Sequence, residues 1–203
     1  MSKVVKGLAG FIGVMGLVAG LAYAAVQLKP TKVLVVKNPP SGPTARAVVW
    51  KVSEPASTNT VVGNPTTNGA KLRIKLTPGG DQCVTMPARG WVALGTLGFK
   101  YKDAALTNGP VKAAGIKKAG SGTFLIKAVL KGGGITVVPG NPTASYATNF
   151  KIGAGDQYCS GSGTAIPSPN DAKTFKVAND TTPGTCTISA CSPSGAFLDP
   201  ILE

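Results

Sequence analysis

The chain has 203 residues and a formal net charge of +13 at pH 7, and 43% of its residues are hydrophobic while only 14% are charged. It contains 27 Gly and 16 Pro, which favour turns and short segments over long helices. This composition excludes a coiled coil, a collagen and a charge-driven disordered chain. The sequence has no His and few acids, and most acid/base and metal chemistry relies on those side chains. We therefore expect an all-β protein that is not an enzyme and binds no cofactor or metal.

An export signal opens the chain. Residues 1–6 carry two lysines, and residues 7–26 contain no charged side chain. Ala22 and Ala24 form the small-x-small pattern of signal-peptide cleavage, so we predict removal of residues 1–24 and a mature chain that begins at Ala25. The alternative is an uncleaved membrane anchor over residues 7–28, because about 20 apolar residues can cross a bilayer. Both interpretations predict an exported protein, which is extracellular, on the cell surface or periplasmic.

An internal repeat with an offset of about 76 residues divides the exported part of the chain. The sequence VVGNPT at 61–66 returns as VPGNPT at 138–143, and a Gly-Asp-Gln turn precedes both Cys83 and Cys159. We predict one β module over residues 31–108, a second over 109–186 and a C-terminal tail over 187–203. One such module buries only a thin core. The expected fold is therefore a duplicated β-sandwich, either pseudo-twofold or built from two apposed small sandwiches, behind an N-terminal apolar helix.

The cysteines predict disulfide bonds. Oxidising conditions outside the cytoplasm make two bridges the expected state, and four cysteines allow three connectivities. A zinc site is not favoured, because the sequence has neither a C-x-x-C knuckle nor a His. The cysteines are Cys83, Cys159, Cys186 and Cys191.

Short motifs follow one another in a recognisable order. They are GNPT (63–66), GAKLRI (69–74), GW (90–91), GFKYKD (98–103), GPVK (109–112) and YC (158–159), with a closing Cys186. In this order the chain resembles a family of uncharacterised secreted bacterial β-repeat proteins, the hypothetical exported proteins. The resemblance covers about residues 31–186 and implies location and fold without an activity. It also implies a bridge between Cys159 and Cys186, which leaves Cys83 and Cys191 as the second pair.

The positive charge is concentrated between Lys29 and Lys131, where only Glu54, Asp81 and Asp103 oppose the basic residues. Such a body attracts polyanions. The lysines are interleaved with apolar residues, which is typical of the solvated faces of half-buried strands and is the simpler interpretation. The residues we select as candidate polyanion contacts are Lys71, Arg73, Lys75, Lys100, Lys102, Lys117 and Lys118.

The sequence offers little for catalysis. A triad that needs His is impossible, and no phosphate-binding loop or calcium loop is present. Asp81 and Asp156 stand in similar turns of the two modules and form the one candidate carboxylate pair, although both are simpler to explain as turn residues.

We therefore expect an exported, non-enzymatic structural or interaction protein of the cell surface, the envelope or an extracellular assembly. Its partners would be other envelope or extracellular proteins, including copies of itself. The first alternative is a basic module that binds acidic polysaccharide, lipopolysaccharide or nucleic acid. The second is a membrane-anchored assembly subunit that contacts the membrane only through residues 7–28.

Overall fold

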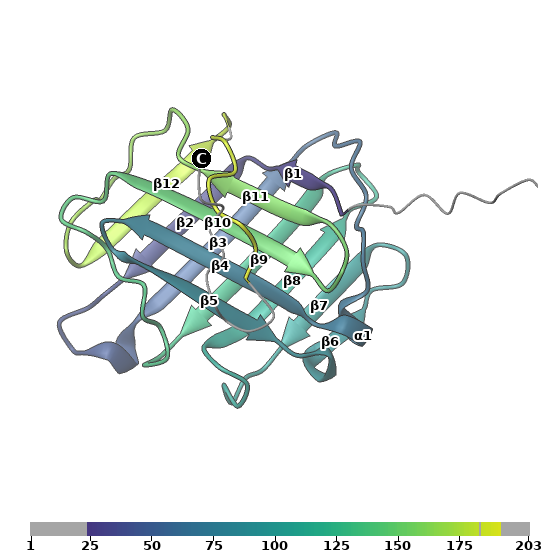
Figure 1. Cartoon of the computed structure of the whole chain (residues 1–203), viewed down its shortest axis with the longest axis horizontal. Coiled ribbons are helices and arrows are strands. Elements are labelled where there is room, and N and C mark those ends of the chain that lie inside the picture. Colours follow the sequence, from purple (N-terminus) through teal and green to yellow (C-terminus); the bar gives the residue numbers. More distant parts are fainter. Residues whose placement is uncertain (1–23, 183, 192–203) are drawn as a thin grey trace, which may run out of the picture.

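The structure, a computed structural model, describes residues 24–182 and 184–191 and consists mostly of strands in two packed β-sheets. The sheets lie face to face, and their strands cross at a steep angle (Figure 1). This arrangement is the expected all-β sandwich. The helical elements are α1 (Pro65–Asn68) and the short 3-10 turns η1 (Pro43–Ala45) and η2 (Ala88–Gly90).

The smaller sheet has the strand order β1-β11-β10-β4-β5. Neighbouring strands are antiparallel, except that β1 pairs with β11 in parallel. The bounds are β1 (Val26–Leu28), β11 (Gln157–Gly161), β10 (Ser145–Ile152), β4 (Ala70–Thr77) and β5 (Gly80–Met86).

The larger sheet has the order β12-β2-β3-β9-β8-β7-β6, with every neighbouring pair antiparallel. The bounds are β12 (Thr174–Asp180), β2 (Thr31–Lys37), β3 (Ala47–Glu54), β9 (Phe124–Lys131), β8 (Val111–Lys118), β7 (Gly98–Lys102) and β6 (Trp91–Ala93).

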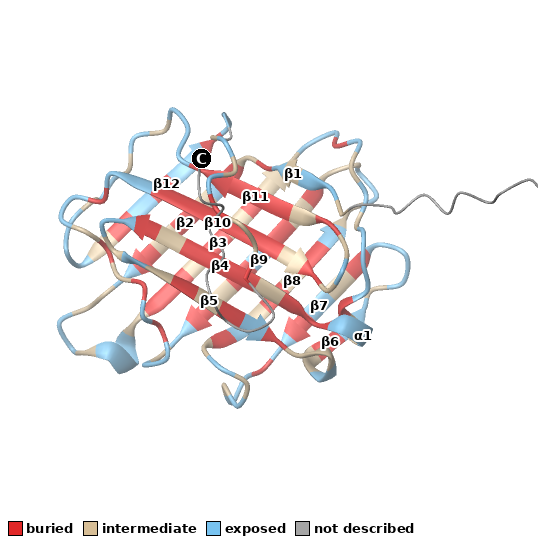
Figure 2. Ribbon diagram, viewed as in Figure 1, coloured by how far each residue is buried: buried red, intermediate tan, exposed pale blue. Residues whose placement is uncertain are grey.

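The core lies between the two sheets, where buried residues line the strands (Figure 2). Strand β9 shows why one face of each strand is buried. Successive side chains of a strand point to opposite faces, and in β9 buried apolar residues alternate with more exposed residues. Trp50 from the larger sheet packs against Phe150 from the smaller one, with ring centroids 6.3 Å apart. Trp91 also contacts Phe150, at 6.4 Å. Burying an aromatic side chain of this size contributes about 2–3 kcal/mol, so this contact holds the layers together.

The same pairing pattern occurs twice. Hairpins β2–β3 and β8–β9 meet through β3 and β9, while hairpins β4–β5 and β10–β11 meet through β4 and β10. Strand β7 lies outside β8 as β12 lies outside β2. Both β2 and β8 also have a register shift at their second residue, Lys32 in one and Lys112 in the other. We use "matching positions" for residues that occupy the same place in the two patterns; Lys100, opposite Gly115, matches Lys176, opposite Val35.

The C-terminal segment 184–191, which we name the strap, crosses the outer face of the smaller sheet (Figure 1). Its contacts follow the strand order from β11 to β5. Cys186 is bonded to Cys159 on β11, and Cys191 to Cys83 on β5, the pairing that the family resemblance implied. Between the two bonds, Ile188 O accepts a hydrogen bond from Asn149 on β10 (3.1 Å), and Ser189 O accepts one from Arg73 on β4 (3.2 Å).

The predicted N-terminal helix and nearly all of the predicted signal peptide, residues 1–24, lie outside the described residues. The last residues of the alternative anchor over 7–28 are described, and Val26–Leu28 form strand β1. Within the part of the chain that the structure describes, no helix is long and apolar enough to cross a membrane.

Candidate functional site

The outer face of the larger sheet carries a field of lysines, which we name the lysine face. Alternation and strand register place these side chains at outward positions, opposite the buried ones. Seven strands at the usual spacing make this face about 30 Å wide. The lysines at outward positions are Lys37, Lys51, Lys100, Lys102, Lys117, Lys127, Lys131 and Lys176.

No acidic residue occupies an outward position on these strands among the residues described. Glu54 alternates inward on β3. Asp180, at the end of β12, is buried and accepts hydrogen bonds from Tyr146 and Gly163, and Asp103 is a buried turn residue just after β7. The outward neighbours of the lysines are instead small or apolar, as at Val49 and Val129. The lysine face is therefore positively charged and not neutralised within its own sheet.

A hollow opens in the lysine face above Gly115, which has no side chain to fill it. Its volume is about 250 Å³, and its apolar lining includes Leu94 and Leu125 as well as parts of Phe99, Ile116 and Ile126, whose strand positions face the core. The rim of this Gly115 hollow is formed by Lys51, Lys100, Lys117 and Lys127. Next to it on the sheet edge, Val92 is 56% exposed and lies opposite Lys100. The site thus joins apolar walls to a ring of positive charge.

The matching positions in the other half of the sheet are different. Gly115 lies between Lys100 and Lys127, whereas Val35 lies between Lys176 and Val49. A valine side chain therefore occupies the place that is open at Gly115.

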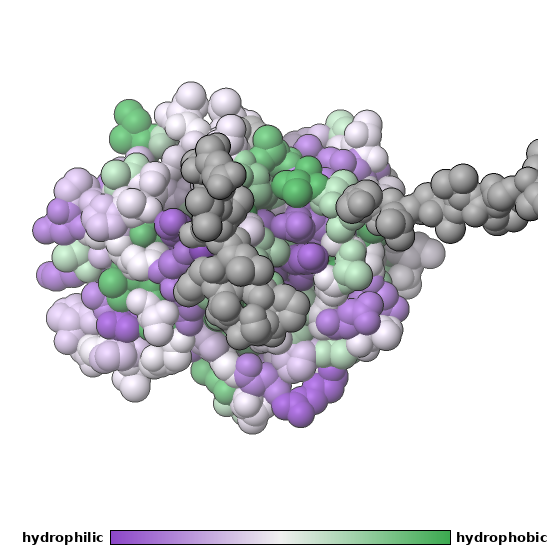
Figure 3. Space-filling model, viewed as in Figure 1, coloured by the Kyte–Doolittle hydropathy of each residue, from purple (hydrophilic) through white to green (hydrophobic). Residues whose placement is uncertain are grey.

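The seven candidates selected from the sequence are divided between the two sheets. Lys100, Lys102 and Lys117 lie on the lysine face, and Lys118 ends the same strand as Lys117. Lys71, Arg73 and Lys75 lie on β4, on the opposite side of the molecule. That side faces the viewer in Figure 3, where the visible residues mix hydrophilic and hydrophobic kinds. Other lysines of the lysine face are not among these candidates, although alternation alone shows them to be solvated; they are Lys37, Lys51, Lys127, Lys131 and Lys176.

Arg73 is unsuited to bind a polyanion. Its guanidinium is only 1% exposed and makes two hydrogen bonds to Asp81, of 2.7 and 3.0 Å. It also donates to the strap at Ser189. Burial here requires pairing, because an uncompensated buried charge is costly. Arg73 therefore stabilises the contact between the smaller sheet and the strap.

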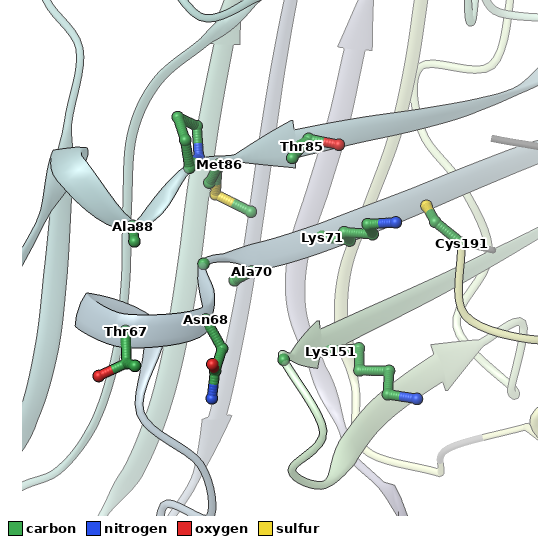
Figure 4. Close-up of a pocket in the computed structure, with 12 residues that line it drawn as sticks. Thr67, Asn68, Ala70, Lys71, Thr85, Met86, Ala88, Lys151 and Cys191 are labelled. Atoms are coloured by element: carbon green, nitrogen blue, oxygen red, sulfur yellow. The ribbon is translucent and has the colours of Figure 1, made fainter. Parts of the chain in front are cut away.

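A second hollow, of about 390 Å³, lies at the end of the smaller sheet beside α1. Lys71 and Lys151 stand opposite each other on β4 and β10, and Cys191 lies nearby (Figure 4). The other side chains drawn there include Asn68, Thr85 and Met86. Among the described residues its lining includes no carboxylate and no His, and its charged groups are the two lysines.

The two aspartates considered as a carboxylate pair are far apart. Asp81 lies on β5, and Asp156 immediately precedes β11, with β4 and β10 between these strands. Among the described residues, no group of three His, Cys, Asp or Glu side chains is arranged to hold a metal ion.

An ion pair between a buried lysine and a partly exposed glutamate lies at one end of the sandwich. Lys29 Nζ is 2.7 Å from Glu54 Oε2 and 4.7 Å from the centroid of the Phe124 ring. Ser57 and Asn59 also donate hydrogen bonds to Glu54. Burial would raise the pKa of Glu54, but these hydrogen bonds and the Lys29 charge outweigh it and hold that pKa below its usual value. The cluster fixes the chain before β2 to the end of β3.

Comparisons with protein-family models, with curated proteins and with solved structures find no match for this chain. Function is therefore inferred from the site itself.

Proposed function

We propose that the protein is an exported, non-enzymatic interaction protein that binds an acylated polyanion, of the lipopolysaccharide class, through the lysine face. The observation that carries this proposal is the lysine face itself, with basic residues on all but one of its seven strands and no outward acid among the described residues. A surface of one sign attracts a polymer of the other sign and accelerates its encounter. The Gly115 hollow supports an acylated ligand over a plain one, because it places apolar walls beside the charges.

The size of the hollow suits part of a ligand. Sites for whole drug-sized molecules usually measure about 300–1000 Å³, while a cavity of about 150 Å³ can hold one benzene. A hollow of 250 Å³ therefore accommodates one short alkyl segment or ring. The remaining ligand would spread over the lysines.

Export is supported by the two disulfides, since such bonds persist in extracellular or periplasmic conditions. A structural role in an envelope or extracellular assembly is the alternative, with copies of the chain as partners. Size-exclusion chromatography distinguishes the two, because a binding module stays monomeric without ligand whereas a self-assembling protein elutes as an oligomer.

We also propose that the sandwich arose by duplication of one module. The proposal is supported by the repeated pairing pattern, the two register shifts and the Phe-Lys pairs 99–100 and 175–176 at matching positions. Because of this duplication, a substitution at a matching position in one half of the lysine face serves as the control for a substitution in the other half.

The decisive experiment compares two double variants. Lys100→Gln with Lys117→Gln removes charge from the rim of the hollow, and Lys37→Gln with Lys176→Gln removes the same charge at matching positions. Both should weaken binding to heparin and lower its log-log salt slope by about one for each anionic group that the protein no longer neutralises. Only the rim variant should also reduce the preference for lipopolysaccharide over its deacylated form. An unchanged salt slope in both variants would refute polyanion binding at this face.

The acyl preference has its own test. Wild-type protein should bind lipopolysaccharide at least about tenfold more tightly than the deacylated form, because burying two methylenes is worth about 1.6 kcal/mol. Gly115→Val fills the hollow as Val35 does in the other half, and should abolish this preference while leaving heparin binding unchanged. Equal affinity of wild-type protein for both forms would leave a plain acidic polysaccharide or nucleic acid as the ligand.

A further inference from the structure

The chain from Ala25 to Lys29, which includes strand β1, is hydrogen-bonded along its length to the segment that contains β11. Ala25 O accepts a hydrogen bond from Gln157 N (2.9 Å), and Lys29 N donates one to Cys159 O (2.7 Å). Between them β1 runs parallel to β11. Chain ends usually fray unless specific contacts tie them down. Ala25 is tied down both at its carbonyl and at its nitrogen.

A buried carboxylate lies at that nitrogen. Ala25 N donates to Asp156 Oδ1 at 2.9 Å, and Gln27 Nε2 donates to Asp156 Oδ2 at 2.5 Å. Asp156 is only 6% exposed. Within the described residues both donors are neutral amides, and no cationic side chain is within ion-pair distance of this carboxylate. The same site contains a buried acceptor without a partner among the described residues, Gln27 Oε1.

A buried negative charge without a counter-charge is unfavourable, and it is normally paired. A positively charged α-amino group at Ala25 would supply the counter-charge, and the sequence predicts that cleavage creates one there. The pattern Ala22-Tyr23-Ala24 predicts cleavage immediately before Ala25, the residue whose nitrogen contacts Asp156. The two features are 131 residues apart in sequence and meet only in the fold.

We propose that Asp156 is a receptor for the α-ammonium group of Ala25, which proteolytic maturation creates. An endopeptidase that recognises the small-x-small pattern hydrolyses the Ala24–Ala25 peptide bond with one water molecule. Ala24 leaves with a carboxylate, and the freed nitrogen of Ala25 takes up the proton and becomes –NH₃⁺. The neutral hydrogen bond to Asp156 becomes a buried ion pair, and the two added N–H donors enter a site with an unpartnered acceptor. Maturation thereby completes the fold at β1, and this inference rests on the export proposed above.

The position of cleavage is tested on native protein. Intact mass after export should show the loss of residues 1–24 and no others from the N-terminus. A mature chain that begins at any other residue would overturn the proposal, since Ala25 is the one described residue whose backbone nitrogen donates to Asp156.

The ion pair is tested by stability. A chain that begins at Ala25 should have an unfolding equilibrium constant about tenfold lower than one that begins at Ala24, because hydrogen bonds between charged groups are about twice as strong as neutral ones. A paired α-amino group has a raised pKa in the folded state. Its contribution is therefore complete below the unfolded pKa of about 8 and is lost as the pH rises above that value.

Asp156→Asn should remove the difference between the two chains, whereas Asp171→Asn, at an exposed turn carboxylate, should preserve it. Two chains of equal stability at pH 6, both with native Asp156, would refute the receptor role. Because no lysine-face ligand enters this experiment, its failure is distinct from failure of the proposed binding function.

Discussion

The two outer faces of this sandwich differ in how their basic side chains are accommodated. Both sheets have basic residues at outward positions, but the strap covers the smaller sheet, whereas within residues 24–182 and 184–191 no segment crosses the lysine face of the larger sheet. Under the strap, Arg73 is buried and bonded to Asp81. On the lysine face, Lys127 is exposed between Gly115 and Lys51, with no acid beside it.

The difference shows that charge alone does not identify a binding surface. A cation whose charge is satisfied inside the fold contributes to stability, and its removal leaves a partner uncompensated. A cation in solvent contributes little to stability and is available to a ligand. The two faces should therefore respond in opposite ways to substitution, the covered face in stability and the open face in binding.

The largest expected effect is on the covered face. Replacing Cys83 and Cys191 by Ser opens a bond with a sequence separation of 108, which by loop entropy costs about 5 kcal/mol or about 10–20 °C in Tm. The Cys159–Cys186 bond spans only 27 residues and should cost less, about 3.5 kcal/mol. Differential scanning calorimetry measures both.

At 10 °C, where both variants remain folded, retention on heparin should equal that of wild type. Loss of retention in the strap variants alone would show that the covered face takes part in binding.

A second contrast uses one substitution on each face. Arg73→Met should lower the free energy of unfolding by about 3 kcal/mol, because Asp81 and the strap lose their partner. Lys127→Met should change it by less than about 0.5 kcal/mol. Urea unfolding gives both values, and salt-dependent heparin binding should be lower for Lys127→Met only. Similar destabilisation by the two substitutions would contradict the division between the faces.

Much of the architecture follows from the sequence. Alternation in segments such as Phe124–Lys131 predicts strands with one buried face, and the Gly and Pro content predicts short elements. The all-β sandwich and the two disulfides are confirmed. Within the repeated GNPT motif, the Asn64 side chain accepts a hydrogen bond from Thr66 N and caps α1.

The separation of the basic residues between two faces could not be predicted. Alternation shows that Lys71 and Lys117 each lie on the solvent side of a strand, but it does not show which sheet contains that strand or what covers it. The strap has no alternation that would assign it to a sheet. The Gly115 hollow depends on Lys100, Gly115 and Lys127 being neighbours across three strands, which only long-range pairing decides.

A smaller effect is expected from the difference between the two halves of the lysine face. Val35→Gly should lower the free energy of unfolding by about 1 kcal/mol, because Gly weakens a strand interior and removes buried contacts. The reverse change, Gly115→Val, should have a smaller effect, since its Cβ would lie 3.3 Å from Phe99 O and the gain in strand preference is offset by this tight approach. Chemical unfolding with constant m-values tests both. A gain in stability for Val35→Gly would contradict the expectation that the valine side chain at position 35 stabilises its half of the sheet relative to the open position at Gly115.

The smallest expected effect concerns acid, and it separates the ends of the sandwich from its faces. Burial acts to raise the pKa of Glu54, but the hydrogen bonds from Lys29, Ser57 and Asn59 lower it further than burial raises it. A carboxyl whose folded pKa is depressed stabilises the protein above its unfolded pKa, which is about 4.3, and this contribution is lost as the pH falls through the folded value. Unfolding followed from pH 6 to pH 2 should therefore show stability falling below about pH 4. Glu54→Gln should flatten part of that fall, whereas Lys127→Gln on the lysine face should leave the shape of the curve unchanged. A curve whose steepness is the same with and without Glu54 would assign the acid response to the hydrogen-bonded turn carboxyls Asp103 and Asp171, whose pKa values are also lowered.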